Sequence, residues 1–288
     1  MTKKSNKKVV LITGCSSGFG LRIAARLASL DYRVVATMRN LSKQDDLVEE
    51  IALRGGEAEI LRLDVLDVDS IKNVIKYIKE KYGHLDVLVN NAGYGIGGFF
   101  EDLTQEEIHS QMETNFFGVQ NVTREALPLM REQRKGTILN ISSVSGLYGL
   151  PCFGAYNASK WALEGFSESL YYELKPFGIN VCLIEPGLYK TKILHENRRY
   201  ATNFFNPQSP YYKISQSFQK RTNDRVKISG RNPEDVAVLV ERLISSNSPP
   251  FRNIPDASGK LLYAFRKFLP FGLFSRLVRY VTRLNSKL

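Results

Sequence analysis

The chain has 288 residues, 43% of them hydrophobic and 24% charged, which is the composition of a folded globular protein rather than a disordered one. The formal net charge of +11 raises the question of a nucleic-acid partner, but no helix-turn-helix, zinc-finger or RNA-recognition pattern accompanies the basic residues, so no nucleic acid is expected to bind. Isolated cysteines, the lack of an apolar run long enough for a bilayer, and Gly14, which ends the first apolar run too early for a signal peptide, predict a cytoplasmic protein.

Apolar runs typical of strands alternate with helical periodicity along most of the chain. The expected strands are Val9–Thr13, Arg33–Met38, Ala58–Val65, Leu85–Asn90, Gly136–Ser142 and Ile179–Glu185. The expected helices include Leu21–Leu30, Ser70–Lys81, Gln105–Met130 and Tyr156–Leu174. Several strands are nearly continuous apolar runs, as expected of strands buried on both faces. This succession predicts an α/β fold in one domain over residues 1–288: a Rossmann-type, doubly wound parallel sheet whose ligand site lies at the carboxyl ends of the strands.

The first strand runs into a glycine-rich loop that precedes a helix. Its residues are Gly14, Cys15, Ser16, Ser17, Gly18, Phe19 and Gly20. Glycines allow a sharp turn and a close approach of the backbone to a pyrophosphate, and the following helix N-terminus adds partial positive charge. The spacing G-x-x-x-G-x-G differs from the commoner dinucleotide fingerprint, and the loop could instead be a structural turn. Its position between the first strand and the first helix favours a cofactor site.

The end of the second strand carries Arg39 where many dinucleotide folds have a carboxylate for the ribose 2′-hydroxyl. An arginine suits a 2′-phosphate, which a carboxylate would repel. We therefore expect NADP(H) to be favoured over NAD(H), with the Ser17 hydroxyl as a second contact; the alternative is a solvated surface arginine.

The third and fourth strands end in further residues that suit a nucleotide. Asp64, followed by Val65, is suitably placed to accept a hydrogen bond from an adenine amino group. The small residues of Asn91-Ala92-Gly93 would allow the backbone to pass close to the cofactor.

The fifth strand ends at Ser142-Ser143, and the next helix carries Tyr156 and Lys160. The i, i+4 spacing puts the phenol and the ammonium on one helical face. A nearby positive charge lowers a tyrosine pKa, which would make Tyr156 a proton donor or acceptor near neutral pH. The spacing alone also occurs in surface helices, so its interpretation depends on the ordered motifs around it.

With these motifs in this order, the chain closely resembles the short-chain dehydrogenase/reductase family over residues 8 to about 192. The resemblance implies a catalytic tetrad of Asn115, Ser143, Tyr156 and Lys160. It implies that Ser143 binds the substrate oxygen, that Tyr156 transfers the proton, that Lys160 holds the nicotinamide ribose and lowers the tyrosine pKa, and that Asn115 supports a proton relay. No metal is implied.

The segment after the sixth strand matches the family's Pro-Gly-x-x-x-Thr pattern with Pro186, Gly187 and Thr191, and Thr191 would bind the nicotinamide carboxamide. Glu185 stands where the wider family commonly has an apolar residue, and the sequence assigns it no role. The family places a substrate lid at residues 188–228. Its aromatic residues favour an apolar alcohol or ketone substrate, as in the branch of 17β-hydroxysteroid and retinol dehydrogenases, or they simply pack the lid against the body.

The C-terminal extension, residues 260–288, is predicted to form a basic amphipathic helix. It would cover the substrate pocket or form a subunit contact, the interpretation we favour, or lie on an anionic membrane surface. The resemblance also allows a homodimer or homotetramer built by the helices around Asn115 and Tyr156. Two other functions stay open: a non-catalytic NADP(H)-binding redox sensor and a membrane-associated scaffold.

Overall fold

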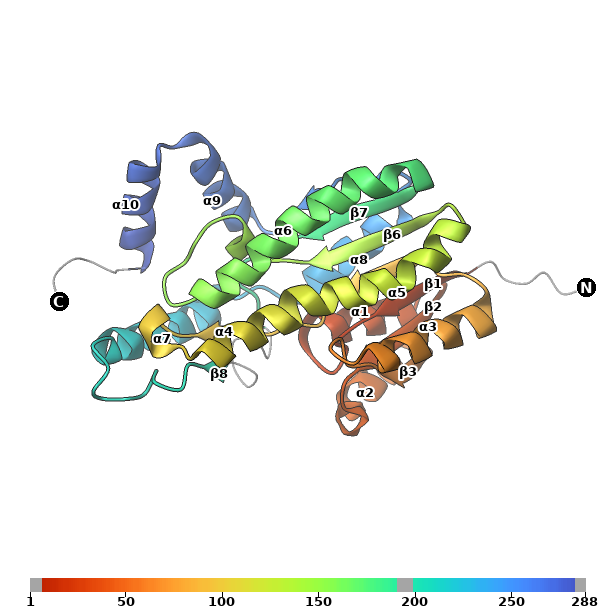
Figure 1. Cartoon of the computed structure of the whole chain (residues 1–288), viewed down its shortest axis with the longest axis horizontal. Helices are drawn as coiled ribbons and strands as arrows, with labels where there is room; N and C mark the ends of the chain where they lie inside the picture. The colour runs from red at the N-terminus through yellow and green to blue at the C-terminus, as the bar shows by residue number, and fades with distance from the viewer. Residues whose placement is uncertain (1–6, 191–198, 283–288) are drawn as a thin grey trace, which may run out of the picture.

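The computed structural model of the chain describes residues 7–190 and 199–282, and a seven-stranded parallel sheet forms its centre (Figure 1). The strands are β1 (Lys8–Ile12), β2 (Tyr32–Met38), β3 (Ala58–Arg62), β4 (Val87–Asn90), β6 (Gly136–Ile141), β7 (Ile179–Ile184) and β9 (Arg252–Asn253). Their order in the sheet is β3-β2-β1-β4-β6-β7-β9, and every neighbouring pair is parallel. The order reverses between β1 and β4, so a ligand crevice is expected there. The predicted doubly wound α/β fold is confirmed.

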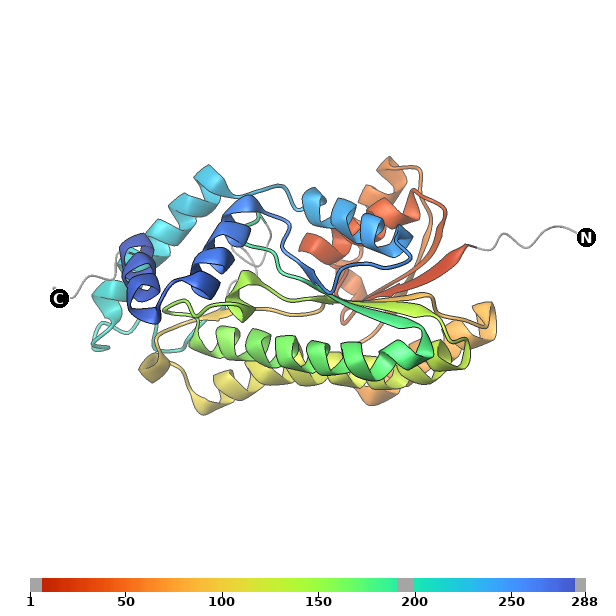
Figure 2. The same cartoon turned by 90° about the horizontal axis from the view of Figure 1, so that it is seen from above.

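Helices cover both faces of this sheet (Figure 2). One layer contains α1 (Gly18–Ala28), α2 (Asp45–Leu53) and α8 (Glu234–Ser245). The other contains α3 (Val68–Tyr82), α5 (Gly118–Glu132) and α6 (Gly154–Leu174). Because helices lie on both faces, the central strands are apolar on both faces: side chains of β1, β4 and β6 alternate between the two cores.

The expected helix Gln105–Met130 is three segments rather than one. α4 (Gln105–Met112) begins with a capping box in which Thr104 and Glu107 bond each other's backbone N–H groups. A π-helical turn, η3 (Glu113–Phe117), separates it from α5. A π-turn shifts the hydrogen-bond register and is common at functional sites. The range predicted to be helical is helical throughout, but its hydrogen-bond register changes at the π-turn that contains Asn115, which was not predicted.

Two helices form the C-terminal extension where one was expected. α9 (Ala257–Phe268) and α10 (Phe271–Thr282) meet at Pro270 and form a V that stands away from the sheet (Figure 1). Leu269, which precedes the proline, is extended, as a residue before proline prefers. Among the described residues, no helix has the length and hydropathy needed to cross a membrane.

The remaining elements lie at the carboxyl end of the sheet. α7 (Tyr212–Ser229) precedes α8, and the short strands β5 (Ile96–Gly97) and β8 (Arg199–Tyr200) form a separate parallel pair. In Figure 2, α7 lies beside the V of α9 and α10. These elements surround the strand ends at which the sequence places its candidate residues.

Candidate active site

The glycine loop follows β1 and is held against the end of β4. Thr13 Oγ1 accepts hydrogen bonds from the backbone N–H groups of Asn91 and Ala92, each at 3.0 Å. The Asn91 side chain in turn donates to the carbonyls of Thr13 at 2.9 Å and Gly14 at 3.0 Å. Two candidate motifs far apart in sequence are thus clamped together, and Asn91 has a structural role in addition to any contact with a cofactor.

The conformation of the loop explains its glycines. Gly14 and Gly18 have positive φ angles of 73° and 61°, which side-chain-bearing residues rarely adopt. A Cβ on Gly14 would lie 2.7 Å from Ala92 Cα, and one on Gly20 would lie 2.3 Å from the Gly14 carbonyl oxygen. The loop opens into the N-terminus of α1, whose first turn carries no acidic residue. A backbone cradle at a helix N-terminus without acidic side chains fits a dinucleotide pyrophosphate.

Arg39 is exposed at the carboxyl end of β2, beside this loop. Cys15 N donates to Thr37 O at 2.8 Å, which fixes the loop two residues from Arg39. No described carboxylate forms an ion pair with Arg39, so its guanidinium can bind an anion. On the next strand, Asp64 Oδ1 accepts from Leu66 N at 3.1 Å and keeps its other carboxylate oxygen for a ligand.

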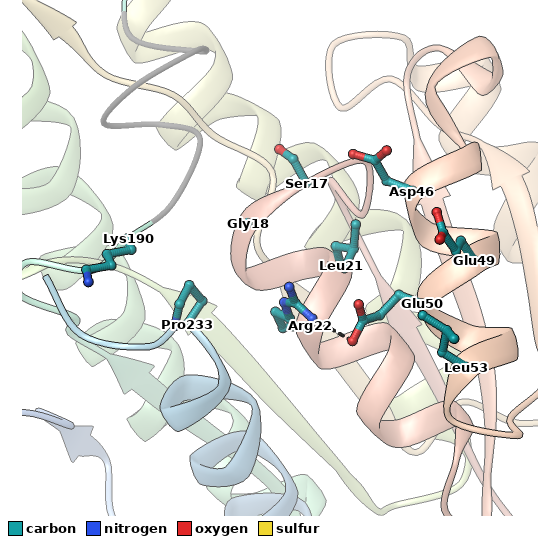
Figure 3. Close-up of a pocket in the computed structure, with 10 residues that line it drawn as sticks. All are labelled: Ser17, Gly18, Leu21, Arg22, Asp46, Glu49, Glu50, Leu53, Lys190 and Pro233. Carbon is teal, nitrogen blue, oxygen red and sulfur yellow. Dashed lines mark ion pairs between the residues drawn. The ribbon is translucent and has the colours of Figure 1, made fainter. Parts of the chain in front are cut away.

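A polar groove lies between α1 and α2 (Figure 3). Asp46 and Glu50 line it from α2, and Ser17 and Arg22 line it from the start of α1, where Arg22 forms an ion pair with Glu50 at 2.5 Å. Carboxylates disfavour a phosphate in such a groove. Because Ser17 faces these acids, Arg39 is the stronger of the two candidate contacts for a 2′-phosphate.

Tyr156 and Ser143 line a pocket of about 670 Å³ at the carboxyl ends of β6 and β7. Burial raises the pKa of Tyr156, and a hydrogen bond with Ser143 lowers it by a smaller amount. Ser142 points elsewhere, because its hydroxyl donates to Glu164. The structure therefore distinguishes the two serines: Ser143 faces the tyrosine, and Ser142 faces a buried carboxyl group.

Lys160 is buried one helical turn after Tyr156. Its Nζ donates to Ile141 O at 2.9 Å and lies 5.7 Å from the centre of the Tyr156 ring. Burial lowers the pKa of Lys160 to about 8, and the charge of Glu164 opposes that change. Desolvation of the phenol is the larger cause of the raised Tyr156 pKa, and the expected lowering of this pKa by Lys160 stays a prediction.

Asn115 lies in the π-turn, and its buried side chain is fully engaged. Its Oδ1 accepts from Tyr94 N at 3.0 Å, and its Nδ2 donates to Tyr94 O at 2.9 Å and Ser159 Oγ at 3.1 Å. A Cβ on Gly93 would lie 3.0 Å from Asn115 Oδ1, so the small residues after β4 leave room for this clamp. Asn115 thereby joins the loop after β4 to the helix that carries Tyr156.

A buried charge network joins α6 to the last strands of the sheet, and most of it was not predicted from the sequence. Arg252 on β9 donates to Glu164 at 2.7 Å and also to Glu185. Asn253 N donates to the second oxygen of Glu185 at 3.1 Å. Burial raises the pKa of Glu185 to about 8, with Glu164 adding to the rise and Arg252 opposing it. Glu185, for which no role was predicted, thus anchors the last strand to the sheet.

Asp256 also escaped the sequence analysis. One of its oxygens accepts from Gly187 N at 2.9 Å, and the other accepts from Gly259 N at 2.6 Å at the start of α9. A Cβ on Gly187 would lie 2.7 Å from the Asp256 carboxylate, which explains the glycine after Pro186. The only sequence signal is an Asp three residues before a small residue at a helix start. Thr191, the last candidate cofactor contact, lies outside the described residues.

The pocket wall is mainly apolar and is built by several elements. Its larger apolar side chains are Phe19, Tyr148, Leu150, Phe153, Leu188, Tyr189, Phe218, Leu262 and Val281. Of the aromatic residues in the expected lid, Tyr189 and Phe218 face the pocket. Others pack against the protein, as where Tyr211 stacks on Phe99 at 4.7 Å. Some aromatic residues of the lid thus line the pocket and others pack the lid against the body.

The C-terminal extension contributes to this pocket as well. Leu262 of α9 and Val281 of α10 line it, and Arg225 of α7 donates to the Val281 carbonyl at 2.8 Å. The structure thus agrees with the interpretation in which the extension covers the substrate pocket.

The family model for short chain dehydrogenases matches residues 8–201. The chain is 38% identical to an uncharacterized oxidoreductase of Bacillus subtilis, with 95% of this chain and 98% of that protein covered. It is 37% identical to 3-ketodihydrosphingosine reductase of Bacteroides thetaiotaomicron, with 90% and 92% covered. It is 38% identical to human retinol dehydrogenase 8, with 85% and 80% covered. These similarities confirm the resemblance inferred from the motifs.

Solved structures of short-chain dehydrogenases and of a ketoreductase are also similar to this chain. A short-chain dehydrogenase from Streptomyces avermitilis is 32% identical with a TM-score of 0.79, covering 98% of this chain and all of that one. An enzyme from Burkholderia phymatum in complex with NAD is 26% identical, with a TM-score of 0.77 and 92% and 95% covered. An actinorhodin polyketide ketoreductase with NADPH is 32% identical, with a TM-score of 0.73 and 87% and 96% covered. The similar structures hold either form of the cofactor.

Proposed function

The chain belongs to the short-chain dehydrogenase family, and from this premise we propose that it interconverts an apolar alcohol and the corresponding ketone or aldehyde with NADP(H). The observation that carries the proposal is the pairing of Tyr156 with Ser143 inside an apolar pocket at the ends of the strands. The relatives named for a sphingoid-base ketone and for retinol support an apolar substrate class.

In the proposed reduction, Ser143 donates a hydrogen bond to the carbonyl oxygen and Tyr156 donates its proton to the same oxygen. When bound, NADP(H) supplies the hydride for reduction or accepts it for oxidation. Lys160, whose pKa is lowered to about 8 by burial, binds the nicotinamide ribose in this proposal, and its positive charge favours the ionised form of Tyr156 after proton transfer. Asn115 holds the loop after β4 in place and supports the relay that returns a proton to Tyr156.

For the remaining cofactor contacts we propose the glycine loop, including Ser16 and Phe19, the adenine-side pair Asp64 and Val65, and the segment from Pro186 to Thr191. Support comes from the loop geometry described above and from the position of Phe19 and Pro186 on the pocket wall. For self-association we propose the helices around Asn115 and Tyr156, on which the aromatic side chains of Phe117 and Trp161 are exposed.

The substitution Arg39→Asp is expected to reverse the cofactor preference. It removes the cation proposed to bind the 2′-phosphate and adds a carboxylate that repels phosphate and accepts from a ribose 2′-hydroxyl. The loss of one charge-assisted contact predicts a rise of about 10- to 100-fold in the Kd of NADPH and a fall in that of NADH. Titration of both cofactors measures this. Arg33→Asp, on the same strand and also exposed, is the matched control; equal preferences in wild type and Arg39→Asp would refute the role of Arg39.

A panel of ketones, aldehydes and steroids with NADPH separates the enzyme from a non-catalytic binder. We expect NADPH oxidation with apolar ketones of a size suited to a pocket of about 670 Å³ and little with small polar ones. NADPH binding is measured in parallel by fluorescence. Firm binding with no turnover on any member of the panel would instead favour the redox-sensor function.

A further inference from the structure

Five large apolar side chains of the α9–α10 hairpin are exposed. Phe268 and Phe271, on either side of Pro270, are 76% and 70% exposed, and Tyr280 on α10 is 78% exposed. Leu261 and Leu273 are more than half exposed beside them. Single exposed apolar residues are common, but a cluster on one protruding element indicates a contact surface. The position of the hairpin in Figure 1 agrees, because its turn lies at the outer edge of the molecule.

The inner face of the hairpin is already occupied. Phe274 is buried, and its ring contacts the ring of Tyr148 with centroids 6.0 Å apart. Leu262 and Val278 pack into the same cluster. Asp256 fixes the start of α9 to Gly187. Because these contacts orient the hairpin, its exposed aromatic side chains are directed away from the protein.

The charge of the hairpin indicates which kind of surface it would bind. From residue 257 to 282 the chain contains no acidic residue but five basic ones: Lys260, Arg266, Lys267, Arg276 and Arg279. Some stand beside the apolar groups: Lys267 Nζ lies 5.6 Å from the centre of the Phe268 ring, and the Arg266 guanidinium 5.9 Å from that of Phe271. Cations interleaved with exposed aromatic side chains are complementary to an interface of anionic headgroups over acyl chains. A nucleic acid would use the cations but leave the apolar side chains in water.

The same hairpin borders the substrate pocket. Leu262 and Val281 line the pocket from the inner sides of α9 and α10, and Ser258 and Thr282 line it near the hairpin's ends. We infer that the α9–α10 hairpin docks on an anionic lipid surface and holds the mouth of the pocket against it, so that an apolar alcohol or ketone dissolved in the lipid reaches the site without crossing water. The docking on lipid does not depend on the proposed reaction. The delivery of substrate from the lipid does, because it rests on the proposed function.

Sedimentation of the full-length chain with vesicles tests the docking. Vesicles of phosphatidylcholine with phosphatidylglycerol should bind the protein, and pure phosphatidylcholine should bind it weakly. The double variant Phe268→Ser, Phe271→Ser should partition about 100-fold less, because burial of each phenylalanine contributes more than a factor of ten. Lys267→Glu with Arg279→Glu should lose about fivefold for each charge removed, and high salt should have the same effect.

Phe100→Ser is the matched control, because Phe100 is 77% exposed but lies on the loop before α4 and should not alter vesicle binding. Turnover of a water-soluble ketone reports on the catalytic site separately, and the phenylalanine variants should keep it, since neither residue lines the pocket. Absence of binding to the anionic vesicles, or equal binding by the double variant, would overturn the inference. A wild-type dimer that becomes a monomer in the double variant, without vesicle binding, would instead make this face a contact between two copies of the chain.

Discussion

The substitution Tyr156→Phe is expected to lower kcat/KM by about 100- to 10,000-fold, the range that a general acid or base contributes. The phenol is the one acidic group hydrogen-bonded to Ser143 within the described part of the pocket, and phenylalanine keeps its ring but not its proton. Steady-state rates with NADPH and a ketone found active in the panel measure the loss. The Kd of NADPH should change by less than about threefold, because the ring and its packing are preserved.

Tyr148→Phe is the control for this experiment, because Tyr148 lines the same pocket but lies in the apolar cluster against α10. Burial raises the pKa of Tyr148, and no hydrogen bond to Ser143 opposes the rise as it does at Tyr156. Tyr148→Phe should keep activity within about threefold of wild type. Substantial turnover by Tyr156→Phe, or a larger loss in Tyr148→Phe, would remove Tyr156 from the role assigned to it.

The substitution Arg252→Met is expected to reduce the free energy of unfolding by about 3–5 kcal/mol at pH 7.5, since it leaves Glu164 and Glu185 buried without their cation. The pH dependence has a definite sign. The folded-state pKa of Glu185 is raised to about 8, above its unfolded value, so its contribution to stability is present at low pH and lost as the pH rises through about 8. Arg252 opposes the rise in the pKa of both Glu164 and Glu185, so its removal raises these pKa values further. The variant therefore loses stability relative to wild type as the pH rises, and it should be closer to wild type at pH 5.5 than at pH 7.5.

Urea denaturation at both pH values measures this difference. The control is Arg62→Met, because the ion pair of Arg62 with Asp67 at 3.3 Å is exposed to solvent and should contribute little to stability. Adding Glu164→Gln and Glu185→Gln to Arg252→Met should recover part of the lost stability, because neutral amides are less costly to bury than unpaired carboxylates. A destabilisation that is the same at both pH values would show that lost packing, not buried charge, is the cause.

Local sequence signals predicted a doubly wound parallel sheet and six of its seven strands, but not the two-residue strand β9. The central strands are continuous apolar runs flanked by glycine or polar residues, and their burial on both faces needs no distant partner to be recognised. The break in the C-terminal extension also has a local signal, Leu269-Pro270, which the amphipathic pattern obscured.

The π-turn and the buried network could not be predicted, for a different physical reason. The helical register at Asn115 depends on hydrogen bonds to the backbone of Tyr94, which is 21 residues away. Arg252 lies 88 residues from Glu164 and 67 from Glu185, on a strand of two residues. Composition and periodicity carry no information about which distant charge will neutralise a buried carboxyl group.

The distance in sequence between Arg252 and the two glutamates also affects how the chain folds during its synthesis. The helix with Tyr156 and Lys160, together with β7, leaves the ribosome well before β9, so the two glutamates are made long before their arginine. Until Arg252 arrives, they can be buried only in protonated form, or they must stay in water. We therefore expect the catalytic helix to dock against the sheet late, after residue 252 has emerged, and a nascent chain that ends before this point to remain accessible to proteases at α6.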